Sequence, residues 1–189
     1  MSDLTQSNPW DELRAHTSAR IALGRVGSSL PTREVLKFGL AHAQARDAVH
    51  RPLDFAGLRE QLDSAGFRTL HVCSDAPDRP TYLLRPDKGR HLQDDCYARL
   101  SAQAPAPELA IVIADGLSSI AVQRHALPLL ELFRQRFNTD WANTPVVLAE
   151  QGRVAIGDGI GVALRARLVI VLIGERPGLT SPDSLGLYL

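Results

Sequence analysis

The sequence has little of several features that would each point to one class of protein. It has only two cysteines, Cys73 and Cys96, which form no CxxC motif, so neither a disulfide framework nor a four-ligand metal motif is indicated. No apolar run approaches the roughly 20 residues that span a bilayer, and the N-terminus lacks the apolar core of a signal peptide. Lysine plus arginine total 21, as do aspartate plus glutamate, so no net charge attracts nucleic acid or an anionic membrane. We therefore expect a cytoplasmic protein that binds neither nucleic acid nor membrane.

Helical signals dominate the first third of the chain. Asn8 and Pro9 predict a helix start, as N-cap and first helical residue, and this helix is expected to end at Gly24. Two more helices are expected over residues 32–49 and 55–65. The sequence therefore predicts an N-terminal helical region over residues 1–66.

From residue 67 onward, short apolar segments alternate with helical patterns. Strands are expected at 67–73, 81–85, 108–115, 145–150 and 167–174, and helices at 87–103, 118–137 and 158–165. Near-continuous apolar strands between helices are typical of a parallel sheet that is buried on both faces. We predict an α/β fold, in which the N-terminal helical region precedes a Rossmann-like, mostly parallel sheet over residues 67–189 with helices on both faces.

Polar loops follow three of the predicted strands, at residues 114–118, 150–154 and 174–178. In open α/β sheets, ligands bind at the carboxyl ends of the strands. If the three strands are parallel, these loops meet along one rim of the sheet. The topology therefore predicts a binding site at that rim.

The third loop holds Glu175 and Arg176 at the end of an apolar strand. Pro177 and Gly178 then turn the chain out of the sheet. The Glu175 carboxylate could accept hydrogen bonds from an amide-rich ligand, or it could form a salt bridge with Arg153 or Arg176. The residues alone leave both interpretations open.

The remaining motifs are weak. Gly157, Gly159 and Gly161 spell GxGxG rather than the GxGxxG of dinucleotide-binding turns, so a plain helix start capped by Asp158 is the alternative to a nucleotide site. Asp115 could bind a ligand, or its loop could simply place a helix cap. No nucleophile stands beside a base, and no motif spacing assembles a metal cage. We therefore predict no catalytic residue and no metal ligand, and we expect a binding partner rather than a self-sufficient enzyme.

Five segments of the chain occur together in one known family. They are "TSARIALGRVGSSLPTREVLKFGLAHAQARDAV", "TYLLRPDKGRHL", "VIADGLSSIAV", "GRVAIGDGIG" and "VLIGERPGLTSPDSLGLYL". In this order they resemble the small (light) chain of ethanolamine ammonia-lyase, from about Trp10 to Leu189. The resemblance implies a lyase subunit that is active only with a large subunit. The large subunit would bind ethanolamine, and this chain would help it hold adenosylcobalamin for the radical deamination of ethanolamine to acetaldehyde and ammonia.

The resemblance also implies specific contacts with cobalamin. Val154, in the "GRV" segment, is expected to contribute through main chain and packing, and Glu175, in "GERPG", should accept hydrogen bonds from the cofactor's amide or hydroxyl groups. The family pattern continues beyond Leu189 into a segment with a cofactor-facing cysteine, which neither Cys73 nor Cys96 matches. We therefore expect the C-terminal end of the domain and the closure of the site to be incomplete.

Two alternatives to this function remain, a nucleotide-binding domain and a purely structural partner subunit. The sequence does not decide whether the enzyme is enclosed in a bacterial microcompartment.

Overall fold

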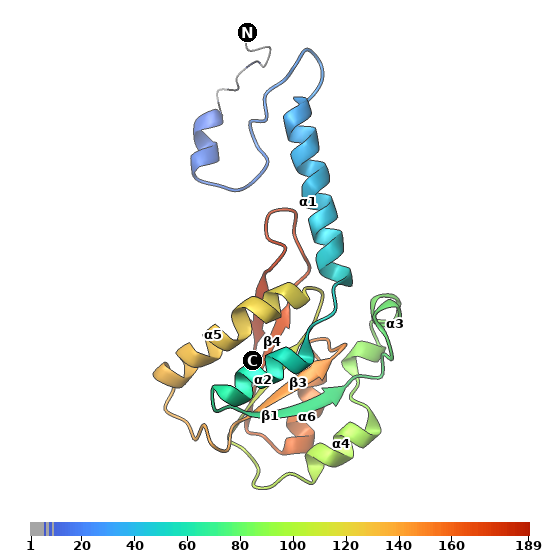
Figure 1. Ribbon diagram of the computed structural model, residues 1–189, viewed down its shortest axis with the longest axis vertical. Coiled ribbons are helices and arrows are strands. Elements are labelled where there is room, and N and C mark those ends of the chain that lie inside the picture. The colour runs from blue at the N-terminus through green and yellow to red at the C-terminus, as the bar shows by residue number, and fades with distance from the viewer. Residues whose placement is uncertain (1–5, 7, 9) are drawn as a thin grey trace.

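The computed structural model describes residues 6, 8 and 10–189 of the chain (Figure 1). The described α-helices are α1 (Thr32–His50), α2 (Phe55–Ser64), α3 (Arg79–Leu84), α4 (Asp94–Ser101), α5 (Ser119–Arg136) and α6 (Ile156–Leu164). Two short 3-10 helices, η1 (Asp11–Ala15) and η2 (Lys88–Arg90), accompany them. The described strands are β1 (Arg68–Cys73), β2 (Leu109–Ala114), β3 (Pro145–Glu150), β4 (Leu168–Gly174) and β5 (Leu185–Tyr188).

These strands form one sheet in the order β1-β3-β2-β4-β5. The first four are parallel, and β5 runs antiparallel to β4. All six residues of the central strand β2 are buried, which explains why its sequence is continuously apolar rather than alternating. The prediction of an α/β fold with a mostly parallel sheet is confirmed.

Two apolar cores lie on opposite faces of this sheet. On one face, Leu58 of α2 and Leu130 of α5 belong to a cluster that includes Ile111 of β2. On the other face, Leu100 of α4 and Ile160 of α6 belong to a second cluster with alternate residues of the same strands. The sheet is therefore covered by helices on both sides (Figure 1).

The strand predicted over residues 81–85 is wrong, because most of this segment belongs to helix α3. The Asp78 side chain caps the helix by accepting a hydrogen bond from the Thr81 N–H at 2.8 Å. Pro80 lies in the first turn, where its fixed φ angle suits a helix. The strand prediction followed the propensities of Thr81 and Tyr82 and overlooked this cap.

The helix predicted to run to Gly24 is also wrong. After η1 the described chain has no regular helix until α1. The Thr17 hydroxyl accepts a hydrogen bond from the Ala19 N–H at 3.1 Å, a local bond that competes with helix formation. The Asn8 side chain accepts from the Trp10 N–H at 3.0 Å, as a cap would, whereas Pro9 lies outside the described residues.

Two further helices differ from their predicted bounds. The segment predicted as one helix over residues 87–103 divides into η2 and α4, because the chain between them pairs with the end of β1: the Gln93 N–H donates to the Cys73 carbonyl at 3.2 Å. Helix α6 begins at Ile156, two residues before Asp158, so Asp158 lies in the first turn instead of capping the helix.

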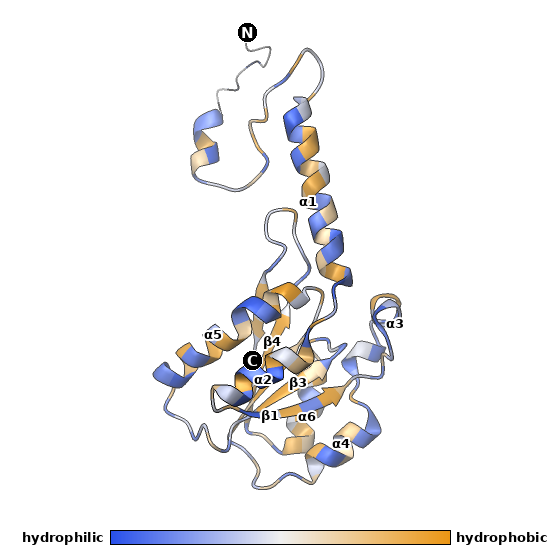
Figure 2. Cartoon of the chain, viewed as in Figure 1, coloured by the Kyte–Doolittle hydropathy of each residue, from blue (hydrophilic) through white to orange (hydrophobic). Residues whose placement is uncertain are grey.

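Helix α1 projects beyond the strand ends of the sheet (Figure 1). Leu36 and Leu40 lie one turn apart on α1 and are 68% and 61% exposed, so they form an exposed apolar stripe on this helix. Figure 2 shows that apolar residues recur along α1. At its base, the Val49 carbonyl accepts a hydrogen bond from the Arg79 Nε at 2.8 Å, which fixes α1 beside the strand ends. None of the described helices is both long and apolar enough to cross a bilayer.

Candidate functional site

The three polar loops predicted to meet at one rim do so. A cavity of about 460 Å³ lies at the carboxyl ends of β2, β3 and β4. Its lining residues come from all three loops and from the segment that contains α3 and η2: Tyr82, Arg90, Gly116, Leu117, Arg153, Val154, Ala155, Asp158, Ile173, Gly174, Glu175 and Arg176. The rim of the sheet is therefore the candidate site, and both predicted contact residues, Val154 and Glu175, lie on it.

Asp115 connects two of the rim loops from below. Its Oδ1 accepts hydrogen bonds from the Gly116 N–H at 3.0 Å and from the Gly152 N–H at 3.1 Å. The residue is only 3% exposed and is not among those that line the cavity, so it supports the loops rather than facing a ligand. Helix α5 has its own cap, because the Ser118 hydroxyl accepts from the Ala121 N–H at 3.3 Å.

Arg79 is the cationic partner of Asp115. Its Nη1 lies 3.5 Å from Asp115 Oδ2 and donates to the Gly116 carbonyl at 2.8 Å. Burial raises the pKa of the Asp115 carboxyl to about 6, and the nearby Arg79 charge opposes this rise. A desolvated carboxylate and a largely buried guanidinium therefore form an ion pair beneath the rim.

The Tyr82 ring lies between two arginines. The guanidinium carbons of Arg79 and Arg153 are 4.7 and 4.5 Å from the ring centroid, within the range of cation–π attraction. Arg153 Nη2 also donates to the Tyr82 carbonyl at 3.0 Å. The sequence pattern predicted a strand at Tyr82 and no element at Arg79, although the Asp78 cap was a readable signal for a helix.

Glu175 follows β4 directly, and its carboxylate is held by β5. Its Oε1 accepts a hydrogen bond from the Tyr188 hydroxyl at 2.5 Å. Gly186, also on β5, lies against this carboxylate, because a Cβ atom at Gly186 would overlap Oε1. Within residues 10–189, Glu175 forms no salt bridge with Arg153 or Arg176, so the structure does not support the salt-bridge alternative.

Val154 precedes helix α6, lines the cavity and is 36% exposed. Its carbonyl accepts a hydrogen bond from the Gly157 N–H at 3.0 Å, in the turn that starts the helix. The Val154 carbonyl therefore already has one partner within the chain, and the residue offers apolar surface on the cavity wall.

The glycines of the GxGxG segment serve packing. Gly157 and Gly161 lie inside α6, one turn apart, and face β4. A Cβ atom at Gly157 would overlap the Val171 side chain, and one at Gly161 would overlap Val169. These glycines allow the helix to approach the strand closely and do not form a phosphate-binding loop before it, so the nucleotide-binding alternative is not favoured.

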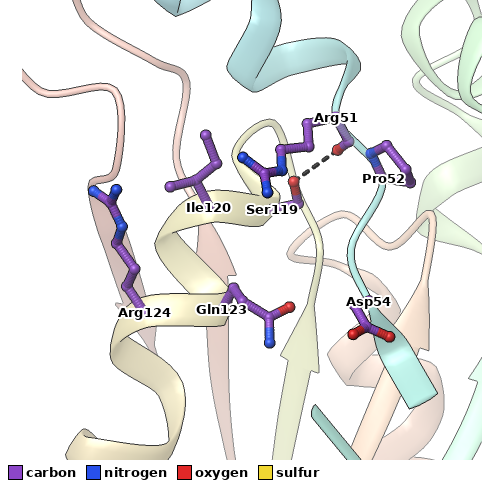
Figure 3. A pocket seen from close by; sticks show the side chains of 7 residues that line it. All are labelled: Arg51, Pro52, Asp54, Ser119, Ile120, Gln123 and Arg124. Atoms are coloured by element: carbon purple, nitrogen blue, oxygen red, sulfur yellow. Dashed lines mark hydrogen bonds between the residues drawn. The ribbon is translucent and has the colours of Figure 1, made fainter. Parts of the chain in front are cut away.

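A second hollow, of about 380 Å³, lies between the loop that precedes α2 and the start of α5 (Figure 3). There the Ser119 hydroxyl donates to the Arg51 carbonyl at 2.7 Å. Figure 3 shows the Arg124 side chain on the far side of α5 from Arg51, and Arg124 pairs with Asp183 at 2.9 Å. Because its charged groups do not converge, this hollow is a weaker candidate than the rim.

Comparison with known proteins agrees with the resemblance drawn from the sequence. A family model described as the ethanolamine ammonia-lyase light chain matches residues 7–189. The chain belongs to this family. The ethanolamine ammonia-lyase small subunit of Azotobacter vinelandii is 54% identical over all of this chain and 72% of its own length.

Two other relatives carry the same name. The small subunit of Pseudomonas fluorescens is 57% identical over 96% of this chain and 68% of its own length. That of Pseudomonas aeruginosa is 55% identical over all of this chain and 71% of its own length.

Proposed function

We propose that this chain is the small subunit of an adenosylcobalamin-dependent ethanolamine ammonia-lyase. With a large subunit, it would deaminate ethanolamine to acetaldehyde and ammonia. The observation that carries this proposal is the match of residues 7–189 to the light-chain family, in a chain whose rim presents a ligand cavity. We propose a cytoplasmic complex, with or without enclosure in a bacterial microcompartment.

The rim residues fit one face of a cobalamin. The corrin ring carries amide groups, which need both hydrogen-bond acceptors and donors. Glu175 offers a carboxylate, and Arg90 and Arg176 offer guanidinium groups around the same cavity. Val154 and Leu117 add apolar surface that can pack against the ring edge. The mixture of polar and apolar groups is that of a cofactor site.

The residues of this chain indicate which role it plays in the complex and which roles belong to the cofactor and the large subunit. When bound, adenosylcobalamin would supply the radical chemistry. Glu175 orients the cofactor by accepting hydrogen bonds, and Val154 excludes water beside it. Asp115 and Arg79 keep the rim loops at a fixed separation, so the accepting and packing groups are positioned before the cofactor arrives. The large subunit binds ethanolamine.

We also propose that different parts of the chain bind the cofactor and the large subunit. Residues 67–189 form the Rossmann-like, cofactor-facing domain, and α2 packs on its sheet as part of the same core. Helix α1 forms an extension that binds the large subunit. Helix α1 supports this view, because it projects at the rim end of the sheet and has an exposed apolar stripe. A partner that covers this stripe would lie over the rim and could enclose a cofactor held there.

Co-expression with a large subunit tests the proposal. We expect the two chains to co-purify and to release acetaldehyde from ethanolamine only when adenosylcobalamin is added. A purely structural subunit would co-purify, but its rim variants would leave the affinity for cobalamin unchanged. If neither co-purification nor acetaldehyde is observed, while the small subunit of a relative succeeds with the same large subunit, the proposal is wrong.

The α1 stripe gives a more specific prediction. Changing both Leu36 and Leu40 to Glu should lower the affinity for the large subunit at least about 10-fold, because buried interface leucines then become charged. Both side chains are exposed in the isolated chain, so its circular dichroism and thermal unfolding should not change. The matched control is Leu132→Glu on α5, which is 51% exposed. An equal loss of affinity in the control would show that α1 is not the docking surface.

A further inference from the structure

A group of potential metal ligands lies on the edge strand of the sheet. His71 and Cys73 are two residues apart on β1, so their side chains point to the same face. Glu150 is the register partner of Cys73 on β3, which places its carboxylate on that face as well. From this arrangement, we propose that His71, Cys73 and Glu150 bind one zinc ion.

The distances among the three ligand atoms suit a tetrahedral ion. His71 Nε2 lies 3.5 Å from Glu150 Oε2, and Cys73 Sγ lies 3.9 Å from the same oxygen. All three atoms lie within 4.8 Å of one another. Zinc bond lengths of about 2.0–2.3 Å at tetrahedral angles require ligand separations of about 3.3–3.8 Å. Small side-chain rotations would therefore bring the three atoms into coordination.

The chemistry of the ligands selects zinc. An imidazole nitrogen, a thiolate and a carboxylate oxygen are the three ligand types that zinc prefers, whereas calcium and magnesium prefer oxygen alone. On binding, the Cys73 thiol would lose its proton to water, and the metal would take the thiolate. Three protein ligands leave the fourth position for a water molecule. His71 and Glu150 are 38% and 43% exposed, so an ion can enter from solvent.

The site would connect two strands. Strand β1 lies at the edge of the sheet and has one strand neighbour, β3. An ion shared by His71, Cys73 and Glu150 would join β1 to β3 at their carboxyl ends. The Phe55 ring at the start of α2 lies 5.7 Å from the His71 ring and limits its rotation. The zinc would therefore stabilise the sheet edge, and Glu150 directly precedes the loop that carries Arg153 and Val154.

Neither the spacing of the ligands nor their number marks this site in the sequence. His71 and Cys73 are separated from Glu150 by more than 70 residues, and the parallel pairing of β1 with β3 brings them together. The other cysteine, Cys96, is buried, and its sulfur accepts from Arg99 Nη2 at 3.0 Å. Among the described residues, His71, Cys73 and Glu150 are the one such group of three whose ligand atoms converge.

Metal titration of the tag-free full chain tests the proposal. We expect calorimetry to show one saturable zinc site with a Kd near or below about 1 µM. Cobalt(II) in place of zinc should give visible absorption bands typical of tetrahedral coordination and a thiolate-to-cobalt charge-transfer band in the near ultraviolet. Absence of saturable zinc binding by the reduced, folded chain would overturn the proposal, whatever the complex does with cobalamin.

Variants assign the ligands. Cys73→Ser should abolish the charge-transfer band, and Glu150→Gln, which keeps the shape of the side chain, should weaken zinc binding about 100-fold. Cys96→Ser and His50→Gln are the matched controls, and both should bind zinc as the parent chain does. A charge-transfer band that survives Cys73→Ser and disappears in Cys96→Ser would overturn the assignment. Zinc should also raise the thermal midpoint of the parent chain but not that of the Cys73→Ser chain.

Discussion

Replacing Asp115 with Ala should lower the free energy of unfolding by about 3–5 kcal/mol, the usual loss when one partner of a buried ion pair is removed. Asp115 is 3% exposed, and its carboxylate accepts hydrogen bonds from the main-chain N–H groups of Gly116 and Gly152. Its loss leaves the Arg79 guanidinium without its charge partner and two main-chain donors without an acceptor. Chemical denaturation of the purified chain measures the change.

A surface ion pair is the matched control for this loss. Asp183 pairs with the Arg124 guanidinium at 2.9 Å, and the Arg124 side chain is 62% exposed. Asp183→Ala should therefore cost no more than about 1 kcal/mol, because solvent screens the pair. If Asp115→Ala costs no more than this control, the Asp115–Arg79 pair does not hold the rim together as we infer.

The same residue should leave a signature in the pH dependence of stability. Burial raises the pKa of Asp115 to about 6, so between about pH 4 and pH 6 the folded chain binds the proton more tightly than the unfolded chain. This carboxyl therefore stabilises the folded state at the low end of that range, and its contribution is lost as the pH rises through 6. Relative to Asp115→Asn, which has no such titration, the parent chain should lose stability on the order of 3 kcal/mol across this range. A constant difference would show that the pKa is not raised.

The sequence predicted the sheet well because its signals are local and strong. Strands β2, β3 and β4 are continuous apolar segments, and each lies within a residue or two of its expected bounds. Ligands bind at the carboxyl ends of parallel strands, so the strand pattern alone was enough to predict the rim as the candidate site. What β5 contributes could not be predicted, because its four residues follow a polar loop and pair antiparallel to β4.

The errors arose where short-range side-chain bonds decide the structure. Thr81 and Tyr82 have strand propensity, but the Asp78 cap and Pro80 place them in a helix. Because helix α3 was not predicted, the sequence did not reveal that Arg79 and the Tyr82 ring support the rim together. The register between distant strands could not be predicted either, because no local pattern indicates that Cys73 pairs with Glu150.

Replacing Glu175 with Ala should weaken the binding of adenosylcobalamin to the complex with the large subunit by about 10- to 150-fold. The range corresponds to the roughly 1.5–3 kcal/mol that one charged hydrogen bond contributes. Assembly with the large subunit should be unaffected, because the side chain faces the cavity and β5 rather than α1. Cobalamin affinity is measured by titrating the purified complex and following the absorption of the cofactor.

Two further variants separate contact from positioning. Tyr188→Phe removes the hydroxyl that donates to Glu175 Oε1 but keeps the carboxylate. If Glu175 contacts the cofactor, this change should cost much less affinity than Glu175→Ala, since the freed oxygen can itself accept a hydrogen bond from the ligand. If the two losses are equal, Glu175 acts by holding β5 in place. The control Glu131→Ala, an exposed residue on α5, should leave the affinity unchanged, and an unchanged affinity in Glu175→Ala would exclude a direct contact with the cofactor.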